Sequence, residues 1–177
     1  MRRAAVFLDR DGVINRALLH GQRPRPPRSL AELELLPGVP AALTALRAAG
    51  YCLVVVTNQP DVARGTTPRS AVDAINARLQ SLLPLDAVRT CLHDDADRCV
   101  CRKPAPGLIN AAASELDLEC ATSYMVGDSW RDVEAGRRAG CRTIFVDHGY
   151  APPPASCDFR AGSLHEAARI ILGKEAP

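Results

Sequence analysis

The chain has 177 residues, of which 47% are hydrophobic, and its 22 Lys and Arg residues nearly balance its 20 Asp and Glu residues. This length and apolar content suit one buried core, so residues 1–177 are expected to form a single domain. The even charge balance argues against a strongly basic nucleic-acid-binding protein or a membrane-surface protein. We therefore expect a small-molecule partner, no nucleic acid, no membrane, and a monomer.

The apolar stretch before Asp9 is too short for a signal peptide or a membrane-spanning helix. A cytoplasmic location is therefore expected. In that reducing compartment, the seven cysteines are expected to be free thiols or metal ligands rather than disulfides.

The chain is expected to begin with a strand, a helix and a second strand. Residues 4–8 are a short apolar run, which predicts a buried strand. Residues 20–28 are rich in Arg and Pro and are interpreted as an ordered or semi-ordered loop. Residues 39–49 have the apolar spacing of a helix and are followed by Gly50, a typical C-terminal stop signal. Residues 51–56 then form a continuous apolar run and predict the second strand.

The same alternation continues through the middle of the chain. Residues 67–83 are predicted to be helical, with Thr67 as the N-cap and Pro68 in the first turn. Residues 87–92 predict a third strand, and a helix is expected over residues 106–116.

The last third of the chain repeats the pattern. Residues 123–126 predict a strand, residues 130–139 a helix and residues 141–146 a further strand. A proline-rich loop then leads to a helix over residues 164–172. Alternating strands and helices predict an α/β fold with three layers, in which a Rossmann-like, mainly parallel sheet carries helices on both faces.

Polar residues follow three of the predicted strands. In an open parallel sheet, ligands bind at the carboxyl ends of the strands near the switch in strand order, so these residues are expected to lie together. They are Asp9 and Asp11 after the first strand, Thr57, Asn58 and Gln59 after the second, and Asp128 after the fourth.

Asp9 and Asp11 are candidates for covalent phosphoryl transfer. Because side chains alternate along an extended chain, these two carboxylates can face the same side. One carboxylate can attack phosphorus to give an aspartyl phosphate, while the second protonates the leaving oxygen and then activates water. Taken alone, the pair is equally compatible with a solvated turn that contains two acids.

Four segments, in order along the chain, resemble the motifs of haloacid dehalogenase-like phosphatases. They are residues 7–15 (FLDRDGVIN), residues 55–59 (VVTNQ), Arg102 with Lys103, and residues 127–129 (GDS) with Asp132. The resemblance spans nearly the whole chain and implies a magnesium-dependent phosphatase. Each motif alone is also compatible with a plainer role, such as a turn or a pair of surface charges, but their joint order at strand ends favours the phosphatase.

The resemblance implies a role for each motif residue, in a reaction where positioning and charge neutralisation provide most of the catalysis. Asp9 is the expected nucleophile and Asp11 the expected acid and base. The residues expected to stabilise the phosphoryl group are Thr57, Arg102 and Lys103. Those expected to bind substrate are Asn15, Asn58, Gln59, Arg102, Lys103 and Ser129. The expected Mg²⁺ ligands are Asp9, Asp128 and the backbone carbonyl of Asp11, all hard oxygen donors.

Asp132 has two interpretations. It can position the fourth motif or reach a metal-bound water, because it lies close to Asp128 in the sequence. The simpler interpretation is stabilisation of the first turn of a helix by a negative charge.

A second metal site is predicted between the third strand and the third motif. Cys91, His93, Cys99 and Cys101 offer three thiolates and one imidazole, a complete tetrahedral Zn²⁺ set. Because protein can fill all four positions, this Zn²⁺ is expected to be structural rather than catalytic and to fix the two basic residues that follow. The alternative is a loop with unrelated free cysteines, and the other four cysteines are interpreted as small buried thiols.

The sequence leaves no room for a large cap domain, so substrate choice is expected to depend on a minimal cap. Together with the zinc loop, this resembles the subgroup that contains D-glycero-D-manno-heptose 1,7-bisphosphate phosphatases and histidinol-phosphate phosphatases. The sequence departs from the expected pattern at Pro60, where a small residue is expected, and at Ser129, where the heptose enzymes often carry lysine. These departures leave the substrate open.

Charge favours the bisphosphate as substrate. Basic residues after the first motif can hold a second phosphate through charge-assisted hydrogen bonds and would repel cationic histidinol. They are Arg16, His20, Arg23, Arg25 and Arg28. If these residues are only solvated, the argument fails. Acids in the zinc loop would favour histidinol phosphate if they face the site, and they are Asp94, Asp95 and Asp97.

A third hypothesis is a non-catalytic, zinc-stabilised phosphate-binding module that acts through protein partners. Asp9 and Asp11 argue against it, because two carboxylates hinder the binding of an anion with which they do not react.

Overall fold

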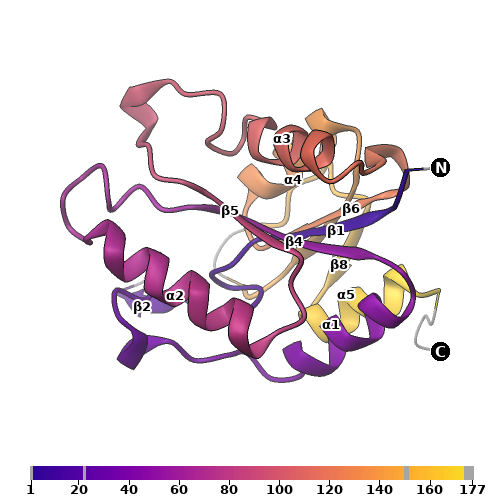
Figure 1. Cartoon of the computed structure of the whole chain (residues 1–177), viewed down its shortest axis with the longest axis horizontal. Helices are drawn as coiled ribbons and strands as arrows, with labels where there is room; N and C mark the ends of the chain where they lie inside the picture. The colour runs from indigo at the N-terminus through magenta and orange to yellow at the C-terminus, as the bar shows by residue number, and fades with distance from the viewer. Residues whose placement is uncertain (1, 22, 150–151, 174–177) are drawn as a thin grey trace.

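The computed structural model describes residues 2–21, 23–149 and 152–173. Its central strands are β1 Ala5–Leu8, β4 Cys52–Asn58, β5 Ala87–Cys91, β6 Tyr124–Gly127, β7 Arg142–Val146 and β8 Phe159–Ala161. They form one parallel sheet in the order β5, β4, β1, β6, β7, β8 (Figure 1). The predicted parallel sheet is therefore confirmed.

Helices cover both faces of this sheet, as the alternating pattern predicts. One face carries α1 Val39–Ala48, α2 Arg69–Leu82 and α5 Leu164–Ile171, and the other carries α3 Gly107–Glu115 and α4 Trp130–Ala139 (Figure 1). Each helix begins and ends within a few residues of its predicted bounds. The three-layer architecture is confirmed.

The central strand β1 is covered on both faces, which accounts for its apolar sequence. Val6 and Leu8 belong to the hydrophobic core beneath α1, α2 and α5, whereas Ala5 and Phe7 belong to the core beneath α3 and α4. All four side chains have no exposed surface. Successive side chains of a strand point to opposite faces, so a strand covered on both faces must be apolar throughout.

The topology brings the motifs together. From β1 the chain moves outward on one side through β4 and β5, and it returns to the other side at β6, which pairs directly with β1. The carboxyl ends of β1, β4 and β6 are therefore adjacent at the switch in strand order, where parallel sheets bind their ligands.

Three local predictions need correction. Residues 20–28, interpreted as a loop, overlap an antiparallel hairpin of β2 Leu18–His20 and β3 Arg23–Arg25. The predicted proline-rich loop between residues 146 and 164 contains the edge strand β8, whose three residues are too few to give a periodic signal. Thr67 does not cap α2, because Pro68 occupies the N-cap position.

Short 3₁₀ helices complete the described elements: η1 Leu30–Glu32, η2 Asp95–Asp97 and η3 Cys120–Thr122. Among the described residues, no helix has the length and apolar character needed to cross a membrane.

Candidate active site

The first motif forms a tight loop directly after β1. The backbone N–H of Asp9 donates to the Val126 carbonyl at 2.9 Å, which continues the pairing of β1 with β6. The carbonyl of Arg10 then accepts the N–H groups of Ile14 at 2.9 Å and Asn15 at 3.1 Å, which closes the loop. Gly12 is needed here, since its φ is +87° and a Cβ at this position would overlap the Asp128 carboxylate.

Lys103 connects the third motif to the first and the fourth. Its side chain is 2% exposed, and its ammonium group lies 2.8 Å from an Asp9 oxygen and 2.6 Å from an Asp132 oxygen. The ammonium also donates to the Val56 carbonyl at 2.8 Å. Asn58 fixes the backbone of Lys103. Its side-chain amide donates to the Lys103 carbonyl and accepts from the Lys103 N–H.

Carboxylates outnumber cations in this part of the site. Burial, followed by the Asp132 carboxylate, raises the pKa of Asp9 to about 7, although Lys103 opposes the shift. Burial also raises the pKa of Asp128 to about 8, with the Asp9 carboxylate as the next cause. Burial alone would lower the pKa of Lys103, but Asp132 and Asp9 raise it above its ordinary range. One ammonium therefore does not neutralise the cluster, and the site favours a further cation.

Three of these carboxylates can hold a divalent cation. Oxygens of Asp9, Asp128 and Asp132 all lie within 4.8 Å of one another. Hard oxygen donors of this kind are the ligands that Mg²⁺ uses. Both interpretations of Asp132 fit the structure, because it also accepts the Ser129 N–H at 3.0 Å in a capping box at the start of α4.

The Asp11 carboxylate lies outside this cluster and is held by a separate network. One of its oxygens accepts Arg10 Nε at 3.2 Å and Asn15 Nδ2 at 2.9 Å. The other accepts Arg10 Nη2 at 3.1 Å and Gln59 Nε2 at 2.7 Å. Any contribution of Asp11 to metal binding therefore comes from its backbone carbonyl, as the motif resemblance implies.

Two residues expected to bind substrate take a different position. Asn15 has no exposed surface and Gln59 is 1% exposed, and both donate to Asp11 instead of lining the pocket. The closed first-motif loop turns Asn15 inward, and Gln59 also donates to the Thr57 hydroxyl at 3.0 Å. Thr57 itself is 1% exposed. The side-chain amides of Asn15 and Gln59 therefore hold the Asp11 carboxylate and are not placed to contact a substrate in the pocket.

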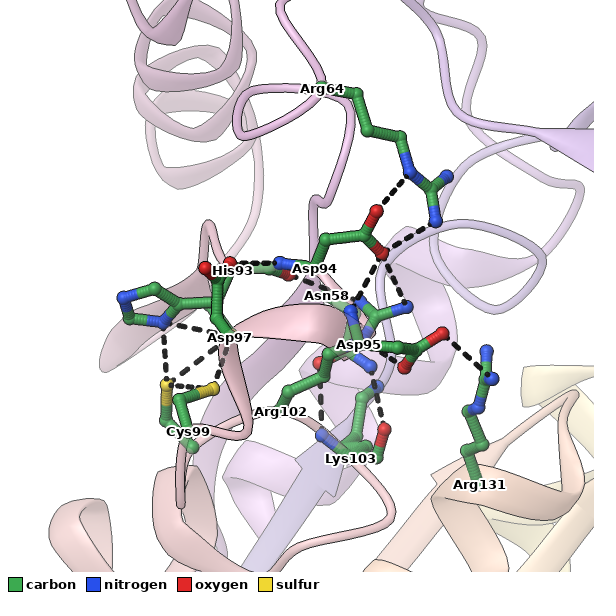
Figure 2. A network of polar contacts seen from close by, with 12 residues as sticks. Asn58, Arg64, His93, Asp94, Asp95, Asp97, Cys99, Arg102, Lys103 and Arg131 are labelled. Carbon is green, nitrogen blue, oxygen red and sulfur yellow. Dashed lines mark hydrogen bonds and ion pairs between the residues drawn. The ribbon is translucent and has the colours of Figure 1, made fainter.

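The predicted zinc ligands converge in space (Figure 2). Cys101 Sγ lies 3.2 Å from Cys91 Sγ, 3.3 Å from Cys99 Sγ and 3.3 Å from His93 Nδ1. Ligand atoms around a tetrahedral Zn²⁺ lie roughly 3.5–3.8 Å apart, so a small adjustment accommodates the ion. Burial raises the pKa of Cys91 well above its usual range, so this thiol needs a nearby cation to ionise at neutral pH. The cysteine cluster fits a zinc-binding loop.

The zinc loop also holds Arg102, as Figure 2 shows. The Arg102 side chain is 7% exposed, its Nη1 donates to the His93 carbonyl at 3.4 Å, and its Nε donates to Asp95 at 2.7 Å. Asp95 also pairs with Arg131 of α4 at 3.4 Å. Asp95 of the loop thereby holds two guanidinium groups of the pocket lining, one from the loop and one from α4.

A pocket of about 240 Å³ opens above these residues. Its lining combines the acids Asp9, Asp11 and Asp128 with Asn58 and Ser129. The cations that line it are Arg25 of β3, Arg102, Lys103 and Arg131.

Comparison with known proteins gives a consistent result. Residues 100–163 match the HAD-hydrolase-like family model. The D-glycero-D-manno-heptose-1,7-bisphosphate 7-phosphatase of Thermosynechococcus vestitus is 38% identical over 85% of this chain and 82% of its own length. The D-glycero-beta-D-manno-heptose-1,7-bisphosphate 7-phosphatase of Escherichia coli K12 is 32% identical over 98% of this chain and 96% of its own length. The chain belongs to the haloacid dehalogenase-like phosphatases.

A solved member of the family has the same architecture as this phosphatase. The D,D-heptose 1,7-bisphosphate phosphatase of Bordetella bronchiseptica, solved with magnesium and phosphate, aligns with a TM-score of 0.81 at 30% identity. The alignment covers 97% of this chain and 99% of that chain.

Sequence reasoning missed one functional candidate of this haloacid dehalogenase-like phosphatase. Arg131 lines the pocket from the first turn of α4, close to the fourth motif. Its Nε is buried and has no hydrogen-bond partner. The signal that could have found it is its position two residues after Ser129, where the expected lysine is absent.

Proposed function

We propose that this phosphatase removes the 7-phosphate of D-glycero-D-manno-heptose 1,7-bisphosphate and leaves the heptose 1-phosphate. One observation carries the proposal, namely that Asp9 shares its pocket with three arginines from separate segments. Lys103 contacts Asp9 and is placed to meet the reacting phosphoryl group. Arg25, Arg102 and Arg131 each pair with a carboxylate but line the same pocket, where their guanidinium groups can donate to a second phosphate. The relatives described above act, by their names, on the same bisphosphate.

The proposed reaction has two steps at Asp9. In the first, an Asp9 oxygen attacks phosphorus as the ester P–O bond breaks, and Asp11 gives its proton to the departing sugar oxygen. In the second, Asp11 takes a proton from water, whose oxygen attacks the aspartyl phosphate and releases inorganic phosphate. Lys103, already in contact with Asp9, offsets negative charge on the transferred oxygens, and the Thr57 hydroxyl can donate to one of them.

We also propose that Mg²⁺ is held by Asp9, Asp128 and the Asp11 backbone carbonyl, with Asp132 close enough to bind it directly or through water. The excess of negative charge among these residues supports the assignment. When bound, Mg²⁺ neutralises charge on the transferred phosphoryl group.

Mg²⁺ should stabilise the protein more strongly at high pH than at low pH. Without a cation, the folded protein holds the pKa values of Asp9 and Asp128 at about 7 and about 8, above the ordinary value of 3.8. The folded state then binds more protons than the unfolded state between about pH 4 and 8, so its stability falls as pH rises through that window. Mg²⁺ binds the ionised carboxylates and restores that stability. Near pH 8 we expect its effect on Tm to exceed that near pH 5 by about 2–4 °C or more, the shift typical of 1 kcal/mol in a chain of this size.

Thermal unfolding with and without Mg²⁺ at several pH values measures this effect. The variant Asp128→Asn should lose most of the pH dependence of the Mg²⁺ effect. A Mg²⁺ effect on Tm that is equal at all pH values would contradict the proposed cation site.

The histidinol-phosphate alternative is not favoured by the acids of the zinc loop. Asp94 pairs with Arg64 at 2.6 Å, and Asp95 pairs with Arg102 at 2.7 Å. The Asp97 carboxylate accepts the backbone N–H of Asp94 at 2.7 Å. Asp94 and Asp95 are therefore already paired with arginines, so they are poorly placed to bind an ammonium group.

The arginines after the first motif contribute less than their number suggests. Arg16 pairs with Glu34 at 3.0 Å, and Arg28 pairs with Asp61 at 3.7 Å. Arg25 pairs with Glu32 at 2.9 Å but lines the pocket. The backbone of Arg23 lies in β3, and its side chain falls outside the described part of the chain. Among the side chains of this group that the structure describes, Arg25 is the one that lines the pocket and is placed to meet the second phosphate in the proposal.

The bisphosphate should be the better substrate by a wide margin. We expect kcat/KM for the heptose bisphosphate to exceed that for histidinol phosphate at least about tenfold, equivalent to about 1.4 kcal/mol of transition-state stabilisation. Steady-state kinetics with both compounds measures the ratio. A tenfold preference for histidinol phosphate would overturn the substrate assignment and leave the phosphatase assignment intact.

Arg131→Gln should weaken recognition of the bisphosphate selectively. Loss of one charge-assisted contact is expected to lower kcat/KM for the bisphosphate by about 10-fold to 100-fold. Turnover of p-nitrophenyl phosphate, which lacks a second phosphate, should change little. The matched control is Arg138→Gln, because Arg138 lies on the same helix, is half-exposed and pairs with Glu134. Equal losses on both substrates would remove Arg131 from the proposed phosphate contacts.

A cytoplasmic location, a monomeric state and a single domain over residues 1–177 remain predictions.

A further inference from the structure

Arg10 is an unusual residue to find in the core beneath an active site. Its side chain has no exposed surface and is among the largest fully buried side chains of the described chain. It does not line the pocket, so it cannot contact the substrate from this position. Burial of a cation is costly unless it is paired and hydrogen-bonded, and an apolar side chain would fill the same space more cheaply. The contacts that Arg10 makes therefore indicate the use of its charge.

That use lies at the neighbouring acid. Within the described residues, Asp11 is the one carboxylate within ion-pair distance of Arg10. Arg10 reaches both Asp11 oxygens, with Nε at 3.2 Å from one and Nη2 at 3.1 Å from the other. Such forked contacts define the plane of the carboxyl group as well as its position.

A second residue fixes the guanidinium from the opposite side. Asn76 of α2 is 8% exposed, and its Oδ1 accepts Arg10 Nη1 at 3.0 Å. Its Nδ2 donates to the Thr90 hydroxyl of β5 at 3.0 Å. A continuous chain of hydrogen bonds thus runs from β5 through α2 and Arg10 to Asp11.

We propose that Arg10 and Asn76 are positioning residues that aim the Asp11 carboxyl group at the leaving oxygen. The proposal rests on the role of Asp11 as acid in the proposed function. In the proposal the proton lies on the Asp11 oxygen that Arg10 Nη2 and Gln59 contact, and to donate that proton to the leaving group this oxygen must give up one of these two donors. Gln59 donates one hydrogen bond to the Asp11 carboxylate, whereas Arg10 donates to both of its oxygens. Arg10 therefore keeps the Asp11 carboxyl group aligned when the hydrogen bond from Gln59 breaks.

Leaving-group dependence separates positioning of an acid from a general structural role. A phenyl phosphate needs a proton on its departing oxygen more than p-nitrophenyl phosphate does, because phenolate is the poorer leaving group. Asn76→Ala should lower kcat/KM for phenyl phosphate by about tenfold or more, since small misplacement of a catalytic group is costly, and should lower that for p-nitrophenyl phosphate much less. Arg10→Met should show the same bias more strongly, and Arg10→Lys should recover only part of it.

Three controls make the outcome decisive. Asn110→Ala removes an exposed asparagine from α3 and should leave both substrates unchanged. Asp11→Asn sets the largest leaving-group bias that loss of the acid can give. Tm and zinc content identify any variant that fails to fold. If Arg10→Met fails to fold because it removes the buried charge pair, Asn76→Ala keeps that pair and provides the test.

A greater loss of kcat/KM on phenyl phosphate than on p-nitrophenyl phosphate is the leaving-group bias. This bias in Asn76→Ala, together with a larger one in Asp11→Asn, supports the proposal. Equal losses on both substrates in Asn76→Ala, with the bias intact in Asp11→Asn, overturn the positioning role alone. No bias in Asp11→Asn overturns the role of Asp11 as acid, and the positioning role with it.

Discussion

Asp9→Asn should abolish turnover and leave the fold intact. The substitution removes the nucleophile, and we expect kcat to fall by at least about 10⁴-fold, as for other covalent catalysts that lose theirs. Asparagine has the same size as aspartate and can still accept a hydrogen bond from Lys103, which also keeps its contact with Asp132. Burial raises the pKa of Asp9 to about 7, so the ionised carboxylate is disfavoured and its removal should not lower Tm.

Activity assays and thermal unfolding test both parts of this expectation. Beryllium fluoride with Mg²⁺, a mimic of the aspartyl phosphate, should raise the Tm of the wild-type protein and not that of Asp9→Asn. Asp73→Asn is the matched control, since Asp73 is an exposed acid on α2 whose side chain is 60% exposed. Substantial turnover by Asp9→Asn would exclude a covalent intermediate at this residue.

Cys99→Ala should remove the bound Zn²⁺, lower the stability of the protein and weaken binding of the bisphosphate substrate. Structural Zn²⁺ contributes about 10–16 kcal/mol of apparent binding energy in isolated zinc-finger peptides, and within this larger core we expect a smaller but measurable loss of several kcal/mol. The loop that contains the cluster also holds Arg102, through the His93 carbonyl and Asp95. Loss of the ion should therefore raise KM for the bisphosphate as well as lower Tm.

Metal analysis, calorimetry and steady-state kinetics on the same preparation measure the three effects. Cys157→Ala is the control, because Cys157 is a free thiol outside the cluster. The zinc assignment would fail if protein prepared without chelators contained no zinc and kept the wild-type Tm and KM.

The sequence by itself determined the layers of the fold and the ends of the strands where chemistry takes place. A strand buried on both faces must be apolar throughout, so β1 and β4 stand out as continuous apolar runs that stop at Asp9 and Thr57. The zinc ligands are also evident in the sequence, since four soft donors within a short segment are typical of a structural zinc site. These signals are local, because each depends on residue type and spacing alone.

Only the tertiary structure decided which side chains pair with which. Lys103 meets Asp9 across 94 positions of sequence, and Arg10 meets Asn76 across 66. Asn15 and Gln59 lie beneath Asp11 rather than on the pocket wall, and Arg131 enters the pocket from the first turn of a helix. The direction of a side chain depends on its rotamer and on the packing around it, and neither is encoded in spacing along the chain. The sequence therefore identified the candidate acid, while the contacts that aim it depend on how the sheet brings α2 and the first motif together.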